Sequence, residues 1–276
     1  MQNLLAGIKL SPFAMLLAPF THRYLLWYLL KKDIEERYRG SVFGVVWAVL
    51  NAIMMLAIYT FVFAFVFKAK WVSSDQSVSD FALIFYIGLV MQMFLSEVMS
   101  RAPHLMLQHR AYVTKISFPL DILGYVITGN SLFHLVVNFG VWCSLLLMLQ
   151  GSLPISLLFA PLVFLPVVFF ALGFAWLFSA VGVFIKDVSH LTGFLSMILL
   201  FLCPIFYPLT MIPEAYRGFL YLNPLTVPVE FARAAFVFDS QLNWHYFGVS
   251  MICSIVFAYI GYLSFQRSRS NFADVL

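Results

Sequence analysis

The chain has 276 residues, of which 63% are hydrophobic and only 10% are charged. Because a soluble globular domain carries about 25% charged residues, this composition excludes an ordinary water-soluble fold. The net charge of +4 does not indicate a nucleic-acid partner, since the basic residues are spread over short loops and fit topology signals instead.

The apolar residues occur in blocks long enough to cross a bilayer, which takes about 20 residues for a hydrocarbon core of about 30 Å. A spanning segment must satisfy its own backbone hydrogen bonds, and the alternation typical of barrel strands is absent, so the blocks predict an all-α membrane protein. The three cysteines lie in apolar segments without metal-ligand spacing. We therefore expect no metal site and no disulfide.

Residues 1–40 are predicted to form a cytoplasmic or interfacial segment. Residues 1–20 have only a weak signal-peptide pattern, because a single lysine precedes the apolar stretch and no small-residue cleavage site follows it. Residues 21–39 predict an amphipathic helix at the membrane surface, with charged side chains around one apolar face. That predicted face consists of Leu26, Trp27, Leu30, Ile34 and Tyr38.

Residues 41–265 are predicted to form a transmembrane domain with six spanning helices, and residues 266–276 a cytoplasmic tail. The expected spans lie near residues 40–67, 81–100, 119–149, 155–185, 188–208 and 245–265. In the first of them, Gly40, Gly44 and Ala48 recur at every fourth position. Small residues at this spacing let helices approach closely, either within the chain or at a dimer seam, and we expect packing within the chain.

Residues 209–244, between the fifth and sixth spans, are apolar but interrupted by prolines and charged residues. Neither half can cross the membrane cleanly, because irregular backbone at membrane depth survives only beside protein or a water-filled cavity. We expect two short helices that dip into the bilayer edge and form an external gate segment. Its candidate residues are Pro213, Tyr216, Asn223, Pro224 and Pro228.

The distribution of lysine and arginine predicts the orientation. With six spans both termini share one side, and that side receives most of the basic residues. Because cytoplasmic loops carry the excess of Lys and Arg, both termini and the 101–118 loop are expected to be cytoplasmic. The 209–244 segment then faces outward.

The sequence contains neither a G-x-x-x-x-G-K-[ST] phosphate loop nor a glycine-rich dinucleotide turn, so the chain is not expected to hydrolyse ATP itself. A membrane-embedded enzyme would need polar groups gathered at one depth. The polar candidates are expected to be scattered, with no catalytic residue among them, and Glu97 and Arg101 are expected to pair on their own helix. These candidates are Gln92, Glu97, Asp121, His134 and Asn138.

Several short motifs occur in a recognisable order. Residues 37–47 read RYRGSVFGVVW after a charged helix, residues 184–187 read FIKD, and residues 203–207 read CPIFY. Residues 222–225 read LNPL, and residues 271–274 read NFAD. From about residue 28 onward the chain resembles ABC-2 type permeases, and among them the polysaccharide exporters: O-antigen permeases, with teichoic-acid and capsule permeases as relatives. Phe43 stands where that pattern has Leu.

The resemblance implies an ABC-2 permease fold and a homodimer bound to two copies of a separate ATPase subunit, which holds ATP and Mg²⁺; this chain itself would bind no cofactor. The machine would export a lipid-linked polysaccharide of O-antigen type across a bacterial inner membrane. Export of teichoic acid or capsule, or small-molecule efflux, are alternatives from the same class, and a membrane-embedded enzyme is an alternative from another.

Aromatic side chains are the candidates for the substrate channel, because sugar C–H faces stack on rings while a smooth aromatic wall offers few strong sites. Lipid-facing packing is the alternative for each ring. The channel candidates are Trp47, Tyr59, Phe63, Phe67, Phe201, Phe206 and Tyr207.

In the resembling family the loop after the second span holds a short coupling helix that docks on the ATPase, whereas a positive-inside anchor is the simpler interpretation of the same charges. The candidates for coupling to the ATPase are Lys31, Asp33, Arg37, Arg39, Gln108, His109, Arg110, Tyr112, Lys115, Lys186 and Asp187.

Overall fold

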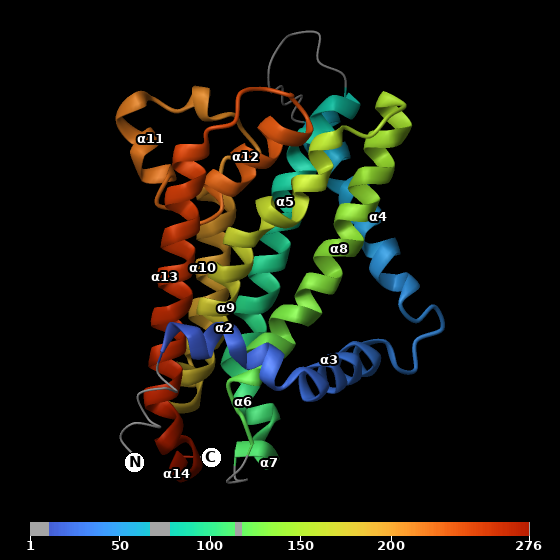
Figure 1. Cartoon of the computed structure of the whole chain (residues 1–276). Coiled ribbons are helices and arrows are strands. Elements are labelled where there is room, and N and C mark those ends of the chain that lie inside the picture. The colour runs from blue at the N-terminus through green and yellow to red at the C-terminus, as the bar shows by residue number, and fades with distance from the viewer. Residues whose placement is uncertain (1–10, 67–77, 114–117, 276) are drawn as a thin grey trace.

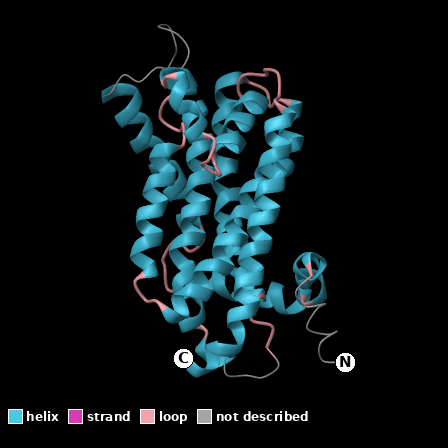
Figure 2. Cartoon of the chain, turned by 90° about the vertical axis from the view of Figure 1, so that its left-hand side faces the viewer, coloured by secondary structure: helices cyan, strands magenta, loops and turns pink. Residues whose placement is uncertain are grey.

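The computed structural model describes residues 11–66, 78–113 and 118–275, and the regular elements in these ranges are helices (Figures 1 and 2). The main helices of the bundle are α4 (Val46–Thr60), α5 (Val78–Arg101), α8 (Ile122–Gln150), α9 (Ala160–Phe184), α10 (Val188–Leu202) and α13 (Trp244–Ser268). The remaining helices are α2 (Pro12–Thr21), α3 (Arg23–Tyr38), α6 (Leu105–Gln108), α7 (Arg110–Val113), α11 (Glu214–Leu220), α12 (Thr226–Phe236) and α14 (Phe272–Val275). A π-helical segment, η1 (Phe61–Val66), continues α4.

Within the described residues, five helical segments are long and apolar enough to cross a membrane. They are Val46–Phe63, Ser79–Gln108, Ile122–Gln150, Ile155–Phe184 and Trp244–Val275. The all-helical membrane architecture is thereby confirmed. The remaining predicted span, 188–208, is too long: α10 ends at Leu202, and Cys203 has an extended backbone. Pro204 explains this end, because the residue before a proline is pushed out of the helical region.

The start of the first span also differs from the prediction. Gly40 and Gly44 lie before α4 with φ of +82° and +52°, a left-handed conformation that favours glycine. A Cβ on either would meet nothing within 4 Å, so these glycines shape a turn and do not pack helices together. Only Ala48 of the predicted small-residue repeat lies in the helix, where it is buried.

The bundle has two distinct ends. Figure 1 shows α2 and α3 lying across the long helices at one end, where α6, α7 and α14 are also found, while α11 and α12 lie at the opposite end. The two short helices α11 and α12 occupy the segment predicted to be broken between spans. The loop after α5 and the C-terminal helix therefore share one end, and the 209–244 segment occupies the other.

Glycines let α9 and α13 cross at close range. A Cβ placed on Gly261 would clash with the carbonyl group of Gly173, so backbone lies directly against backbone. Lower on α9, a Cβ on Gly182 would clash with the backbone of Pro103, in the turn between α5 and α6. Small residues at such crossings maximise van der Waals contact between membrane helices. α9 is thus the central helix against which both α13 and the segment after α5 are fixed.

Replacing Gly261 with leucine should therefore lower stability by more than the about 1–3 kcal/mol typical of an overpacked core, because backbone cannot yield as a side chain does. The measurement is the apparent melting temperature in detergent. Gly248→Leu is the matched control on the same helix, since a Cβ there meets nothing within 4 Å. Equal melting temperatures for the two variants would contradict the close crossing.

Candidate functional site

A cavity of about 620 Å³ lies between α4, α5 and α8 and is bordered by the C-terminal end of α3. Trp47 and Asn51 of α4 form one wall, and Ser96 and Ser100 belong to the α5 wall. Four of the polar residues expected to be scattered also line this cavity, which corrects that prediction: Gln92, Glu97, His134 and Asn138. The fifth, Asp121, lies elsewhere, with its carboxylate 3.8 Å from Arg269. The cavity offers many donors and acceptors beside an indole ring, which suits a hydroxyl-rich ligand.

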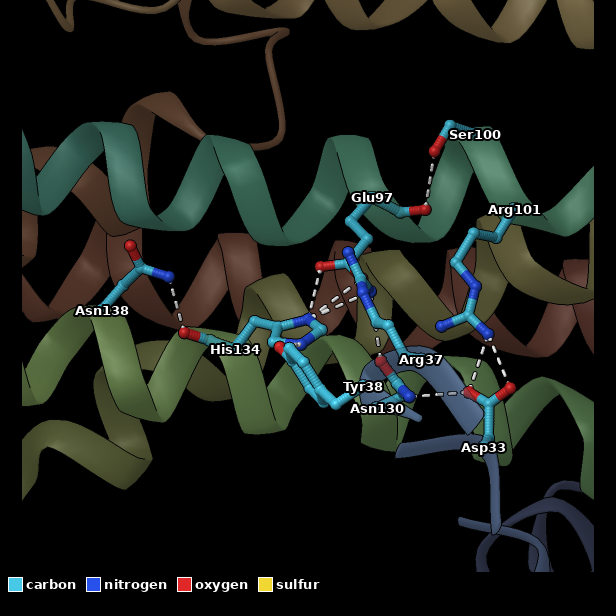
Figure 3. A network of polar contacts seen from close by, with 9 residues as sticks. All are labelled: Asp33, Arg37, Tyr38, Glu97, Ser100, Arg101, Asn130, His134 and Asn138. Carbon is cyan, nitrogen blue, oxygen red and sulfur yellow. Dashed lines mark hydrogen bonds and ion pairs between the residues drawn. The ribbon is translucent and has the colours of Figure 1, made fainter. Parts of the chain in front are cut away.

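Glu97 is the centre of a polar network that joins three helices (Figure 3). Its carboxylate accepts a hydrogen bond from the guanidinium of Arg37, on α3, and forms an ion pair with it. The same carboxylate lies 3.0 Å from Nδ1 of His134, on α8. The side chains of Glu97 and His134 are only 18% and 12% exposed, whereas that of Arg37 is 44% exposed, so α3 is joined to α5 and α8 by a half-buried polar cluster.

Tyr38 completes the surroundings of His134. Its hydroxyl lies 2.8 Å from Nε2, while both oxygens of Glu97 face Nδ1. Nη1 of Arg37 also lies 3.3 Å from Nδ1, so the imidazole is held between a carboxylate, a guanidinium and a phenol. Burial raises the pKa of Tyr38, which keeps the phenol protonated and able to donate.

A second ion pair lies one helical turn away on α3. Nη2 of Arg101 donates to both carboxylate oxygens of Asp33, at 2.9 and 2.7 Å, and Nδ2 of Asn130 donates to the same group at 2.7 Å. The predicted pairing of Glu97 with Arg101 is therefore wrong. Although these two residues are four apart on α5, each takes a partner on α3, because Asp33 and Arg37 have the same four-residue spacing and face them.

The helix α3 packs on α8 largely with the predicted face, since Leu26, Leu30, Ile34 and Tyr38 are all half-buried. Leu29 is buried, and Leu30 fits over Gly129, where a Cβ would lie 3.1 Å from its methyl group. Trp27, assigned to the apolar face, is instead 68% exposed together with Tyr24. Trp27 is thus the exception on the predicted face, and Leu29 and Asp33 extend the inward side toward the network.

An aromatic cluster lies farther along α4, beyond the cavity. The rings of Tyr59 and Phe63 stack at 6.3 Å, and Phe206, which follows α10, lies parallel to Phe63 at 4.4 Å. Phe85 of α5 packs against these three rings at 5.8–6.3 Å. Phe201 lies 6.3 Å from Phe206 at its edge. We call Tyr59, Phe63, Phe85 and Phe206 the aromatic cluster; it joins segments that are far apart in the sequence.

Arg233 fixes α12 to the rest of the molecule. Its side chain is 1% exposed and donates to the carbonyls of Ile84, Pro204 and Ile205 at 2.8, 2.5 and 3.1 Å. It also pairs with Glu230 at 2.7 Å. Gly88 leaves room for the guanidinium, because a Cβ there would lie 3.2 Å from Nη2. The sequence analysis did not select Arg233; a charge in a mostly apolar short helix was the signal for it.

Comparison with known proteins agrees with this architecture. The family model described as ABC-2 type transporter matches residues 24–237. The chain belongs to the ABC-2 type transporter family. This ABC-2 chain is also similar to two curated relatives named O-antigen export system permease protein RfbA. The one from Klebsiella pneumoniae is 23% identical over 91% of this chain and 95% of its own length. The one from Myxococcus xanthus is 24% identical over 92% and 96%.

The predicted channel residues of the ABC-2 chain fall into two places. Trp47 lines the cavity, whereas Tyr59, Phe63 and Phe206 meet in the aromatic cluster with Phe201 at its edge. The hydroxyl of Tyr207 turns back to the carbonyl of Phe201, at 2.8 Å. Phe67 lies outside the described residues.

The predicted coupling residues of the ABC-2 chain divide into an inward and an exposed group. Asp33 and Arg37 form the ion pairs with α5, and the ring of Tyr112 stacks on Phe118 at 4.5 Å and on His109 at 5.8 Å. Lys115 lies outside the described residues. Arg37 is exposed in spite of its ion pair, and the other exposed members are Lys31, Arg39, Gln108, Arg110, Lys186 and Asp187.

In the predicted gate segment of the ABC-2 chain, Asn223 makes the principal contact with α10. Its Nδ2 donates to the carbonyl of Leu199 at 2.8 Å, and its Oδ1 accepts from the amide of Leu225 at 2.9 Å. Pro213 precedes α11, whereas Pro228 is buried within α12. Tyr216 is exposed and Pro224 half-buried. The segment is thus fixed to the bundle through Asn223 and Arg233.

Proposed function

We propose that this chain is the membrane subunit of an ABC exporter that moves a lipid-linked, O-antigen-type polysaccharide from the cytoplasm across a bacterial inner membrane. Membership of the ABC-2 family and the names of the relatives support this class of substrate. The main structural support for the proposal is the arrangement along α4, where a polar cavity is followed by an aromatic cluster. Hydroxyl-rich rings can hydrogen-bond in the first and stack in the second.

The exposure of α4 supports a second copy of the chain as partner. Only 11% of the residues in its apolar span are buried, against 83% for the span of α5. Ala48 and Ala52 face the bundle, while Ile53 and Ile58 are among the apolar side chains left exposed. A homodimer with the two α4 helices facing each other would enclose a path between them, with the cavities at one end and the aromatic clusters at the other.

The proposed orientation places α3, α6, α7 and α14 on the cytoplasmic side and the gate segment outside, as the Lys and Arg distribution favours. Both termini are then cytoplasmic, which requires six crossings. α10 supplies the remaining crossing. Its 15 residues extend about 22 Å at about 1.5 Å per residue, and the non-helical turn after Leu202 completes the distance.

Energy would come from two copies of a separate ATPase subunit that binds ATP and Mg²⁺. The short helices α6 and α7 are the proposed docking elements, with Arg110 exposed on α7. Because Pro103 lies directly against Gly182 of α9, a displacement of this segment would be transmitted to the central helix of the bundle.

Deleting the gene is expected to remove the polysaccharide from the cell surface while its lipid-linked precursor accumulates inside. Expression of the intact chain should restore export, provided that the ATPase subunit is present. The measurement is surface glycan by immunoblot together with the intracellular lipid-linked pool. If teichoic acid or capsule is lost from the surface instead, that polymer is the substrate. An unchanged envelope with altered drug sensitivity would contradict polysaccharide export and favour small-molecule efflux.

A paired substitution tests whether the aromatic cluster acts on the substrate. Replacing Tyr59 and Phe63 together with alanine should reduce surface glycan per inserted transporter about three- to tenfold, since each aromatic stack contributes about 1–3 kcal/mol in the comparable case of nucleic-acid bases and less for sugars. Replacing both with leucine retains apolar bulk and removes only the rings. Full export by the leucine pair would show that the rings serve packing alone.

A further inference from the structure

A second cavity, of about 220 Å³, lies at the gate end of the molecule between the α11–α12 junction, α12 and the start of α13. Its volume is far above the ~10–15 Å³ that one water molecule requires, so the cavity has room for a ligand of several heavy atoms. Its apolar floor includes Phe231 and Val227. Its polar rim consists of Tyr221, Glu230, Gln241, Asn243 and Tyr246.

The two tyrosines form a rigid aromatic wall. Tyr221 and Tyr246 stack with their ring centroids 5.4 Å apart and their planes at 12°, yet they remain 42% and 48% exposed. Each ring restricts the other, so this wall is preorganised and a ligand does not have to order it. Flat, exposed rings of this kind accept the C–H face of a pyranose, while phenol hydroxyls at the rim can hydrogen-bond to its substituents.

The carboxylate of Glu230 is held in a fixed position at the cavity. Its Oε1 pairs with the buried Arg233 at 2.7 Å, while the side chain remains 36% exposed and lines the cavity. A carboxylate accepts hydrogen bonds from neighbouring hydroxyls, and the amides of Gln241 and Asn243 can both donate and accept. Because the guanidinium of Arg233 offsets the charge of this carboxylate, recognition rests on hydrogen bonds to hydroxyl groups, which suits a neutral sugar.

The cavity is connected to the aromatic cluster through Arg233. The guanidinium binds Glu230 on one side and the carbonyl of Ile205 on the other, and Phe206 of the cluster is the next residue along the chain. The cavity therefore lies at the gate end of the molecule and is linked to the aromatic cluster through one guanidinium.

We propose that this cavity, between Tyr221, Tyr246 and Glu230, is a binding site for a single pyranose unit of the exported glycan as it leaves the membrane. The proposal rests on the function proposed above. A weak site at the exit holds the emerging unit long enough to oppose backward sliding and releases it as the next unit arrives. Recognition of one ring, in a cavity of this size, makes the site sensitive to the sugar and not to the length of the polymer.

Binding is tested on the whole transporter with its ATPase in lipid nanodiscs, by saturation-transfer difference NMR. The probes are methyl α-D-glucopyranoside, methyl α-D-mannopyranoside, methyl α-D-galactopyranoside and N-acetylglucosamine, each at millimolar concentration. At least one should give a transfer signal that falls fivefold or more in Tyr246→Ala and in Gln241→Ala. Phe219→Ala is the control, because Phe219 is 65% exposed on α11 and does not line the cavity. No signal from any probe, or a signal unchanged in Tyr246→Ala, would overturn the site.

Export in cells gives the second measurement. In the gene-deletion strain, Tyr246→Ala should restore two- to fivefold less surface glycan per inserted transporter than Phe219→Ala. If the intact chain restores surface glycan and both variants match it, the exit site is wrong while the exporter function stands. If the intact chain has no effect on surface glycan, the function fails, and the NMR result alone then decides whether the cavity binds a sugar.

Discussion

Arg233→Met is expected to destabilise the protein by about 3–5 kcal/mol, the cost typical of removing one partner from a buried ion pair. The side chain is 1% exposed, and its loss leaves the carbonyls of Pro204, Ile205 and Ile84 without their donor. Each unsatisfied buried acceptor adds its own desolvation penalty. The apparent melting temperature of the purified protein measures the loss, and protease sensitivity of residues 209–244 shows whether α12 has detached.

Arg217→Met is the matched control for this substitution. Arg217 also lies in the gate segment and pairs three residues back, with Glu214, but its side chain is 35% exposed and that of Glu214 is 90% exposed. A surface pair of this kind contributes about 0–1 kcal/mol. Arg217 also donates to the carbonyls of Ile212 and Thr210, at 2.9 and 3.4 Å, but at a half-exposed position where water can replace it. Arg233→Lys keeps the charge but not the planar fork of donors, so an intermediate melting temperature is expected. Equal melting temperatures for Arg233→Met and Arg217→Met would refute the role of Arg233 in fixing α12.

The long helices could be predicted because the bilayer imposes their length and composition. The prediction failed where local chemistry interrupts an apolar run: Pro204 ends α10 early, and Gly40 and Gly44 form a turn where their spacing suggested helix packing. At these places the apolar run of the sequence continues, but the helix does not. Glycine spacing alone does not distinguish a close helix crossing, as at Gly261, from a left-handed turn.

The types of residue in the site could be predicted from the sequence, but which side chains contact one another could not. Aromatic residues of α4 and of the segment after α10 were chosen separately, and Tyr59 and Phe206 do meet, at 6.2 Å. The pairing of Glu97 was missed because its partner lies 60 residues away on a helix whose direction across the bundle no local pattern specifies. Single-sequence spacing rules apply within one helix, so they suggested Arg101 instead.

The ion pair between Arg37 and Glu97 is expected to connect the surface helix α3 to the bundle, and a charge exchange tests this connection. In Glu97→Arg, three basic groups would face one another, because Arg37 and His134 both contact the original carboxylate. α3 should then separate from α5 and α8, and export should fall at least about tenfold, equivalent to about 1.4 kcal/mol. Arg37→Glu alone should give a similar loss, since two carboxylates then face each other.

The double variant Arg37→Glu/Glu97→Arg restores opposite charges at the same two positions, and export should return to within about threefold of the unchanged chain. The residues are in direct contact, for which coupling energies of about 0.5–3 kcal/mol are usual. Exchanging Lys32 and Glu36 is the control, because this pair is 46% and 58% exposed on the same helix and should contribute little. The measurement is surface glycan per inserted transporter, with ATP hydrolysis by the assembled complex recorded in parallel. A double variant no more active than either single variant would show that the pair does not connect α3 to the bundle. Recovery of export together with its coupling to ATP hydrolysis would establish the ion pair as the connection between the surface helix and the transport path.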